Sequence, residues 1–180
     1  MKNLCIAVLI LLVACSPPQR GVQVKTYFDL SAFLNAQIVA LNAEKPLLSK
    51  TVAVDDQPEI HQTRHVDWSK ELDLFTQADL NKPAFVGSYI VEEISKTTTT
   101  YRLKSGEDLP VHYLEVILDG KTNQPLKVKA TLRTKNYLYE SERSLSFTCT
   151  DGRLTNYAVE GFQQLFFGDP NPFRIEGRIL

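Results

Sequence analysis

The segment Leu-Lys-Val-Lys-Ala-Thr-Leu-Arg, residues 126–133, alternates strictly between apolar and polar side chains. Successive side chains of a β-strand point to opposite faces, so this segment predicts a strand with one apolar and one polar face. Residues 173–180 repeat the pattern, with Phe173 and Ile175 opposed by Arg174 and Glu176. Such strands are typical of an antiparallel sheet that buries one face and leaves the other in water.

The segments on both sides of residues 126–133 also predict strands, so the second half of the chain is expected to consist of consecutive strands. We predict strands over residues 85–94, 97–103, 111–118, 126–133, 137–149, 154–166 and 173–180. Short turn signals separate most of them, and the Asp-Gly pair at 151–152 is a strong hairpin signal. The expected topology is therefore an antiparallel meander.

The amino-terminal part of the domain predicts helices. Apolar residues recur at helical spacing in residues 27–43, and a second helix is expected from Asp67 to before Pro83. Between them, residues 48–54 and 59–66 predict a hairpin. The expected fold class is α+β: two amino-terminal helices with a hairpin between them, packed on a long curved antiparallel meander sheet that forms a half-barrel or a barrel-like shape.

The first residues of the chain carry a targeting pattern. Lys2 precedes an uncharged apolar run that is too short to cross a bilayer, as in a secretory signal. The run ends in Leu12-Val13-Ala14-Cys15, which resembles the lipobox of bacterial lipoproteins. That resemblance implies cleavage of residues 1–14 and attachment of diacylglycerol to Cys15. We expect residues 15–24 to be a tether and residues 25–180 a single domain.

The same resemblance implies a location. Ser16 follows the cysteine where an aspartate would favour the inner membrane, so we expect an outer-membrane lipoprotein facing the periplasm. Tyr27-Phe28-Asp29-Leu30 and residues 67–72, Asp-Trp-Ser-Lys-Glu-Leu, are also loosely similar to segments of small uncharacterised lipoproteins from Bacteroidetes-type bacteria. The curved sheet resembles envelope lipid-carrier folds in outline. Neither similarity implies a particular activity.

The charge and cysteine content limit the partners and cross-links that we expect. The chain has 20 basic and 21 acidic residues; loss of Lys2 with the signal leaves 19 and 21, a net charge of −2. The charges are scattered, which disfavours nucleic acid as a partner. With Cys5 removed and Cys15 acylated, Cys149 is the only free thiol, so no intramolecular disulfide is expected.

Few residues suggest a metal-binding or catalytic site. His61 and His65 have a four-residue spacing that chelates zinc on a helix. On the expected strand they lie roughly 13 Å apart at 3.3 Å per residue, so we expect two solvated histidines, with a metal site as the alternative. His112 stands alone. Cys149 shares the alternation of the apolar residues before it and is expected in the core.

The carboxylate pairs Asp55-Asp56 and Glu92-Glu93 are explained by solvation, and no nucleophile, phosphate-binding or dinucleotide motif is present, so we expect no cofactor. Residues 161–168 are the most apolar aromatic stretch of the mature chain. We expect them to pack in the core, with partner docking as the alternative.

These observations favour a non-enzymatic binding or interaction module whose partner is a protein or an apolar small molecule. The alternatives are a carrier that encloses an apolar ligand or lipid in the curved sheet, and a hydrolase whose residues the sequence does not identify. A carrier should enclose a continuous apolar cavity. A hydrolase should bring titratable side chains together in one concave pocket.

Overall fold

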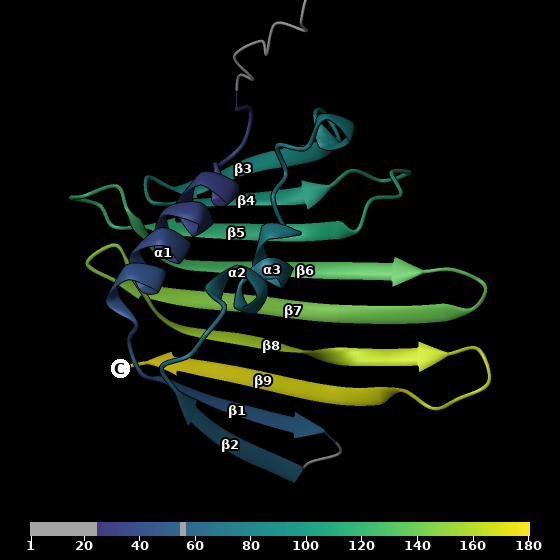
Figure 1. Ribbon diagram of the computed structural model, residues 1–180. Coiled ribbons are helices and arrows are strands. Elements are labelled where there is room, and N and C mark those ends of the chain that lie inside the picture. The colour runs from purple at the N-terminus through teal and green to yellow at the C-terminus, as the bar shows by residue number, and fades with distance from the viewer. Residues whose placement is uncertain (1–24, 55–56) are drawn as a thin grey trace, which may run out of the picture.

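The computed structural model describes residues 25–54 and 57–180. Its main feature is a nine-stranded antiparallel sheet (Figure 1). The strands are β1 (Leu48–Val54), β2 (Gln57–Thr63), β3 (Tyr89–Ser95), β4 (Thr98–Leu103), β5 (Val111–Leu118), β6 (Pro125–Lys135), β7 (Tyr139–Thr150), β8 (Arg153–Leu165) and β9 (Asn171–Ile179). Strands β3 to β9 follow one another as the expected meander. The prediction from alternation and turn chemistry is confirmed for this part of the chain.

The amino-terminal hairpin is part of the same sheet. Strand β1 pairs with the last strand, β9, along its whole length, from Leu48 opposite Ile179 to Val54 opposite Phe173. The strand order is therefore β2-β1-β9-β8-β7-β6-β5-β4-β3, and the amino-terminal hairpin lies beside the last strand of the chain. The sequence predicted a seven-stranded sheet and a separate hairpin; the structure instead has one sheet of nine strands, which includes the hairpin.

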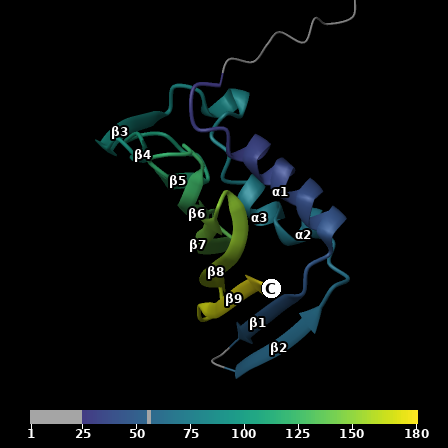
Figure 2. The same ribbon diagram turned by 90° about the vertical axis from the view of Figure 1, so that its left-hand side faces the viewer.

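The sheet is curved but open. Strands β2 and β3 are its edges and do not pair with each other, so the barrel alternative is wrong. Figure 2 shows the sheet as a curved layer with all the helices on its concave side. The opposite side, here called the outer face, is not covered by any described helix.

The first helix is close to its expected place. Helix α1 (Leu30–Glu44) begins after Asp29, whose carboxylate accepts a hydrogen bond of 3.0 Å from the Ala32 amide. The expected start at Tyr27 is three residues too early, because the backbone around Tyr27 bonds to a distant loop instead of forming a turn.

The expected second helix is wrong as a continuous element. Residues 67–82 instead form two four-residue turns, α2 (Trp68–Glu71) and α3 (Asp73–Thr76), which meet at Leu72. The residues that follow leave the helical path to bury Ala78 and Leu80, so tertiary packing overrides the local pattern. No helix within residues 25–54 and 57–180 is long and apolar enough to cross a membrane.

Two strand boundaries also differ from expectation. The predicted strand over 85–94 begins only at Tyr89, because a 3₁₀ turn, η1 (Pro83–Phe85), and Gly87 at φ 86° precede it. The second hairpin strand covers Gln57–Thr63 instead of residues 59–66.

One core joins the helices to the concave face. Phe33 of α1 stacks on Phe147 of β7, with ring centroids 5.6 Å apart. The Gln37 side chain is also buried: its Nε2 donates to the Gly152 carbonyl and its Oε1 accepts from the Leu154 amide, both at 2.9 Å. These bonds fix α1 over the end of the sheet where β7 turns into β8.

Candidate functional site

The residues singled out for chemistry do not converge among the described residues. Cys15 lies outside them. His61 lies on β2 and His65 in the segment after it, both exposed, and the contact given for His61 is a 4.0 Å approach of its Nε2 to the Glu59 carboxylate. Within residues 25–54 and 57–180 no three His, Cys, Asp or Glu side chains form a group that could hold a metal ion.

The remaining candidates are also dispersed. His112 lies on β5, while Cys149 is buried on β7 beside the core, as expected. Burial raises the pKa of the Cys149 thiol to about 12, so the thiolate needed for nucleophilic attack is absent at neutral pH. Glu92 pairs with Arg102 across β3 and β4 at 3.5 Å. Asp55 and Asp56 lie outside the described residues.

Sequence patterns did not identify the polar cluster that lies between α2 and the sheet. Glu71 of α2 accepts a 2.5 Å hydrogen bond from the Tyr157 hydroxyl of β8, and Lys50 of β1 lies 2.7 Å from the same carboxylate oxygen. Burial, and then the bond to Glu71, raise the pKa of Tyr157. The phenol therefore stays protonated at neutral pH, and the cluster joins α2 to β1 and β8.

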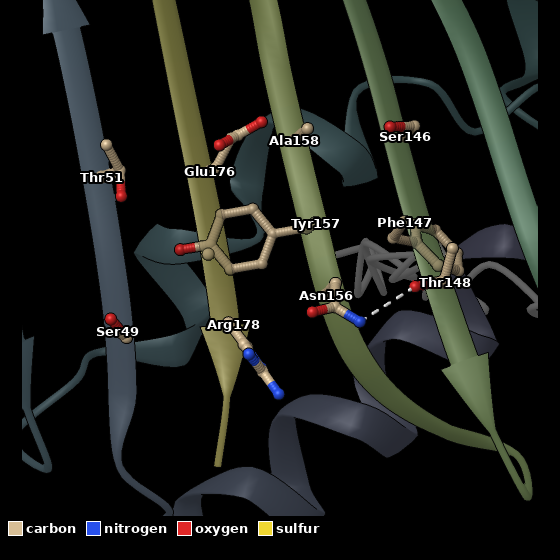
Figure 3. A pocket seen from close by; sticks show the side chains of 11 residues that line it. Ser49, Thr51, Ser146, Phe147, Thr148, Asn156, Tyr157, Ala158, Glu176 and Arg178 are labelled. Carbon is tan, nitrogen blue, oxygen red and sulfur yellow. Dashed lines mark hydrogen bonds between the residues drawn. The ribbon is translucent and has the colours of Figure 1, made fainter. Parts of the chain in front are cut away.

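The outer face is polar and contains a shallow groove of about 420 Å³. Figure 3 shows its small side chains on β1, β9, β8 and β7, with an Asn156 to Thr148 hydrogen bond among them. Two cations on this face have carboxylate partners: Arg133 lies 2.8 Å from Glu142, and Lys129 lies 3.9 Å from Glu115. The outer groove is thus lined by hydroxyl groups and solvated side chains that water can satisfy.

A second groove lies on the concave side, in the half of the sheet that the helices do not cover in Figure 1. We call it the concave groove; its volume is about 380 Å³ and it opens to solvent. Five of its eight lining residues are apolar, and no acid, histidine or thiol is among them. The lining residues are Val52, Val54, Leu74, Arg143, Gln163, Asn171, Phe173 and Ile175.

Strand pairing explains how this floor is assembled. Arg143 lies opposite Gly161, Gly161 opposite Phe173, and Phe173 opposite Val54, which makes one row across β7, β8, β9 and β1. Gly161 puts no side chain between Arg143 and Phe173. A Cβ there would lie 2.0 Å from the Glu142 carbonyl oxygen, so glycine allows the close approach of β8 to β7.

Arg143 is the single charged residue among those lining the concave groove. Its Nε atom is buried and has no hydrogen-bond partner within the part of the chain that the structure describes. The adjacent Glu142 points to the outer face, where it pairs with Arg133. A buried donor of a charged group without an acceptor is costly and calls for an explanation.

The aromatic stretch is exposed, contrary to the expectation of core packing. Leu165, Phe166 and Phe167 end β8 and begin the following turn, with Phe167 95% exposed. The Phe166 amide donates to the Leu138 carbonyl at 2.9 Å, which joins this turn to the β6–β7 turn. We call the exposed apolar residues of both turns the hairpin tips: Tyr137, Leu138, Leu165, Phe166 and Phe167.

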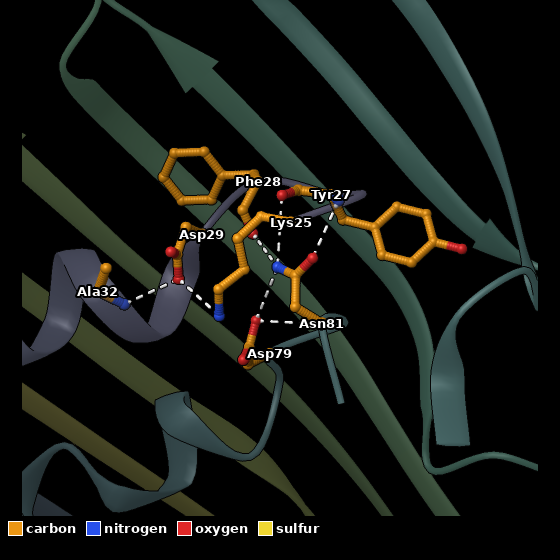
Figure 4. A network of polar contacts seen from close by, with 7 residues as sticks. All are labelled: Lys25, Tyr27, Phe28, Asp29, Ala32, Asp79 and Asn81. Atoms are coloured by element: carbon orange, nitrogen blue, oxygen red, sulfur yellow. Dashed lines mark hydrogen bonds and ion pairs between the residues drawn. The ribbon is translucent and has the colours of Figure 1, made fainter. Parts of the chain in front are cut away.

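The chain enters the domain through a buried polar network (Figure 4). The Asn81 side chain accepts from the Tyr27 amide at 3.0 Å and donates to the Phe28 carbonyl at 3.0 Å. The Tyr27 hydroxyl accepts from the Gly87 amide, and its ring meets those of two other tyrosines edge-on. These contacts fix the backbone of Tyr27 and Phe28 against the loop that carries Asn81.

Comparisons with known proteins give no further identification. No family model matches the chain, and no curated protein and no solved structure matches it.

Proposed function

We propose that this chain is a lipid-anchored protein of the bacterial envelope, held to the outer membrane through Cys15 and facing the periplasm. Its domain is a non-enzymatic binding module, and the concave groove is the surface that binds. The anchor rests on the lipobox-like residues 12–15 and on Ser16 after them. The binding module rests on the apolar floor of the concave groove.

The groove follows from the dimensions of the elements. Strands β7 and β8 have 12 and 13 residues, roughly 40 Å at 3.3 Å per residue. Helix α1 crosses them and covers about one helix width, 10–12 Å, with α2 and α3 beside it (Figure 1). The apolar side of the sheet therefore continues beyond the helices, and Val52, Phe173 and Ile175 line a groove there.

The shape favours surface docking over a sealed carrier. The concave groove is open to solvent, whereas a carrier that shields its cargo needs an enclosed cavity. An open groove takes an apolar segment or chain that arrives from outside. This supports a module that presents or captures an apolar partner.

A neutral apolar fluorophore, N-phenyl-1-naphthylamine, tests the groove. It is titrated into the fragment 25–180, which contains every residue of the described core. We expect saturable fluorescence enhancement that Val54→Lys weakens by roughly tenfold. This is about 1.4 kcal/mol, within what the contact of one valine side chain contributes.

Val39→Lys is the matched control, because Val39 is an exposed valine on α1, away from the groove. It should leave the titration unchanged. Equal weakening by both substitutions, or no saturable signal in the wild type, would reject the concave groove as the binding surface.

A further inference from the structure

The concave groove combines an apolar floor with one unneutralised positive charge. The five apolar residues form its sides and floor, and Arg143 supplies its single charge. Elsewhere in the described sheet, the cations Arg102, Lys129 and Arg133 lie within 4 Å of a carboxylate. Arg143 has no such carboxylate partner among the described residues, since its strand neighbour Glu142 is turned to the other face, and it is the one charged residue that lines the groove.

We propose that the concave groove binds a single-chain amphiphile with one negative charge, a fatty acid carboxylate. Its head group accepts hydrogen bonds from the Arg143 guanidinium, and its alkyl chain lies over Val52, Phe173 and Ile175. This inference rests on the proposed function, because it takes the concave groove as the binding surface and specifies the ligand.

The charge count favours a carboxylate. A guanidinium forms paired hydrogen bonds with carboxylates and phosphates alike. A phosphate near neutral pH carries up to two charges, and Arg143 is the one cation that lines the groove. Gln163 and Asn171 add neutral amide groups to the lining. One cation with two amides matches one carboxylate.

The size favours one chain. A volume of about 380 Å³ is near the lower end of the roughly 300–1,000 Å³ range of small-molecule pockets. The apolar floor is a strip formed by neighbouring positions of β9 and β1: Ile175 lies opposite Val52, and Phe173 opposite Val54. A strip of this form accommodates a single alkyl chain more readily than the two chains of a phospholipid.

The hydrogen bonding of Arg143 sets it apart from an arginine kept for stability. Such an arginine would be expected to have an acceptor in the fold, and within residues 25–54 and 57–180 the buried Nε of Arg143 has none. A carboxylate in the groove would bond to the accessible terminal nitrogens of the guanidinium, because Nε itself is closed to solvent. Arg143→Gln should therefore weaken ligand binding without lowering resistance to urea, because it removes a buried donor that the protein itself does not satisfy.

The test uses the full lipidated chain in neutral phosphatidylcholine vesicles. Hexadecanoic acid and hexadecanol, each carrying a diazirine in mid-chain, are photo-crosslinked to it, and the labelled peptides are identified by mass spectrometry. We expect the acid to label peptides from β1 and β9 about tenfold more than the alcohol does, since one hydrogen-bonded charge contributes at least ~1.4 kcal/mol. Unlabelled hexadecanoic acid should compete.

Substitutions of Arg143 distinguish the contribution of its charge to labelling from that of the apolar groove. Arg143→Gln should reduce labelling by the acid to the level of the alcohol, and Arg143→Lys should retain part of the difference. Arg178→Gln is the matched control: it removes an arginine from β9 that lines the outer groove. It should leave labelling by both probes unchanged.

Each other outcome has a defined meaning. Equal labelling by acid and alcohol, unaffected by Arg143→Gln, would overturn the charged ligand and leave the proposed binding surface intact. Absence of label from β1 and β9 with both probes would overturn the proposed function as well. Competition by hexadecyl phosphate ten times stronger than by hexadecanoic acid would overturn the carboxylate assignment. A fall in urea resistance in Arg143→Gln would show a structural role instead.

Discussion

Cys149 points from β7 into the core, on the same face as Leu145 and Phe147. Burial raises the pKa of its thiol from 9.0 to about 12. The folded state therefore binds the thiol proton more tightly than the unfolded chain does. Its contribution to stability is complete below pH 9 and is lost as the pH rises from about 9 to 12.

The expected consequence is alkaline destabilisation that depends on this residue. Between pH 8 and pH 10 the free energy of unfolding of the wild type should fall by about 1.4 kcal/mol more than that of Cys149→Ala, since one pKa unit corresponds to about that energy. Urea unfolding at both pH values measures the difference. Identical pH dependence in the two proteins would contradict the burial argument.

Two residues of β7, Cys149 and Arg143, differ in how far the sequence predicts their surroundings. The burial of Cys149 follows from strand alternation, because inward positions recur at every second residue. Arg143 also occupies such an inward position, although it is charged. The same alternation turns Glu142 to the outer face, but where the helices end above the sheet is not encoded near residue 143.

At the scale of elements, α2 is joined to the sheet through one tyrosine. The Tyr157 ring lies over Gly177 of β9, where an added Cβ would be 2.0 Å from the ring atoms. This ring position allows the hydroxyl to reach Glu71, which also pairs with Lys50. Glycine at 177 is thus a condition for the contact between α2, β1 and β8.

Gly177→Ala should displace the ring and lower the free energy of unfolding by about 1–3 kcal/mol, the usual cost of overpacking, with loss of the tyrosine hydrogen bond added. Chemical denaturation measures the change. Gly120→Ala is the matched control, because its Cβ would meet Thr97 Cγ2 at an ordinary 3.5 Å. If both alanines cost the same, the ring contact is not what requires glycine.

Elements also differ in how well local sequence predicts them. The meander from β3 to β9 follows from alternation and short turns, which are local. The pairing of β1 with β9 joins distant residues, such as Leu48 and Ile179, which are 131 positions apart, and no local pattern specifies it. The prediction of a continuous second helix was wrong for a similar reason. Residues 77–82 bury Leu80 and accept a hydrogen bond from Tyr27, and helical periodicity does not reveal these long-range contacts.

At the scale of the molecule, the two faces of the sheet have different chemistry. The outer face carries paired charges and hydroxyl groups, which water satisfies. The concave side buries the core under the helices and continues as the concave groove beyond them. The sequence predicted one apolar and one polar face. It did not predict where the helices end, and that boundary creates the groove.

The proposed anchor also belongs to the scale of the whole molecule, because it would decide where the domain stays. If Cys15 carries the diacylglycerol, Cys15→Ala should lose labelling by radioactive palmitate and accumulate as a precursor. Cys149→Ala should label like the wild type, since its thiol is buried. Labelling of Cys15→Ala at the wild-type level would show that the lipobox interpretation is wrong.

Removing residues 1–24 should release a folded domain from membranes. The core cluster begins at Tyr27, and no helix in the described residues could span a bilayer. If Cys15 carries the diacylglycerol, its two acyl chains, at about 0.8 kcal/mol per buried methylene, should dominate membrane affinity, and without them the domain should remain in the supernatant after vesicle sedimentation. If it sediments instead, Phe166→Ser with Phe167→Ser identifies the cause. Release by that double substitution would assign membrane contact to the hairpin tips, whose two exposed phenylalanines are the apolar side chains best placed to enter an interface.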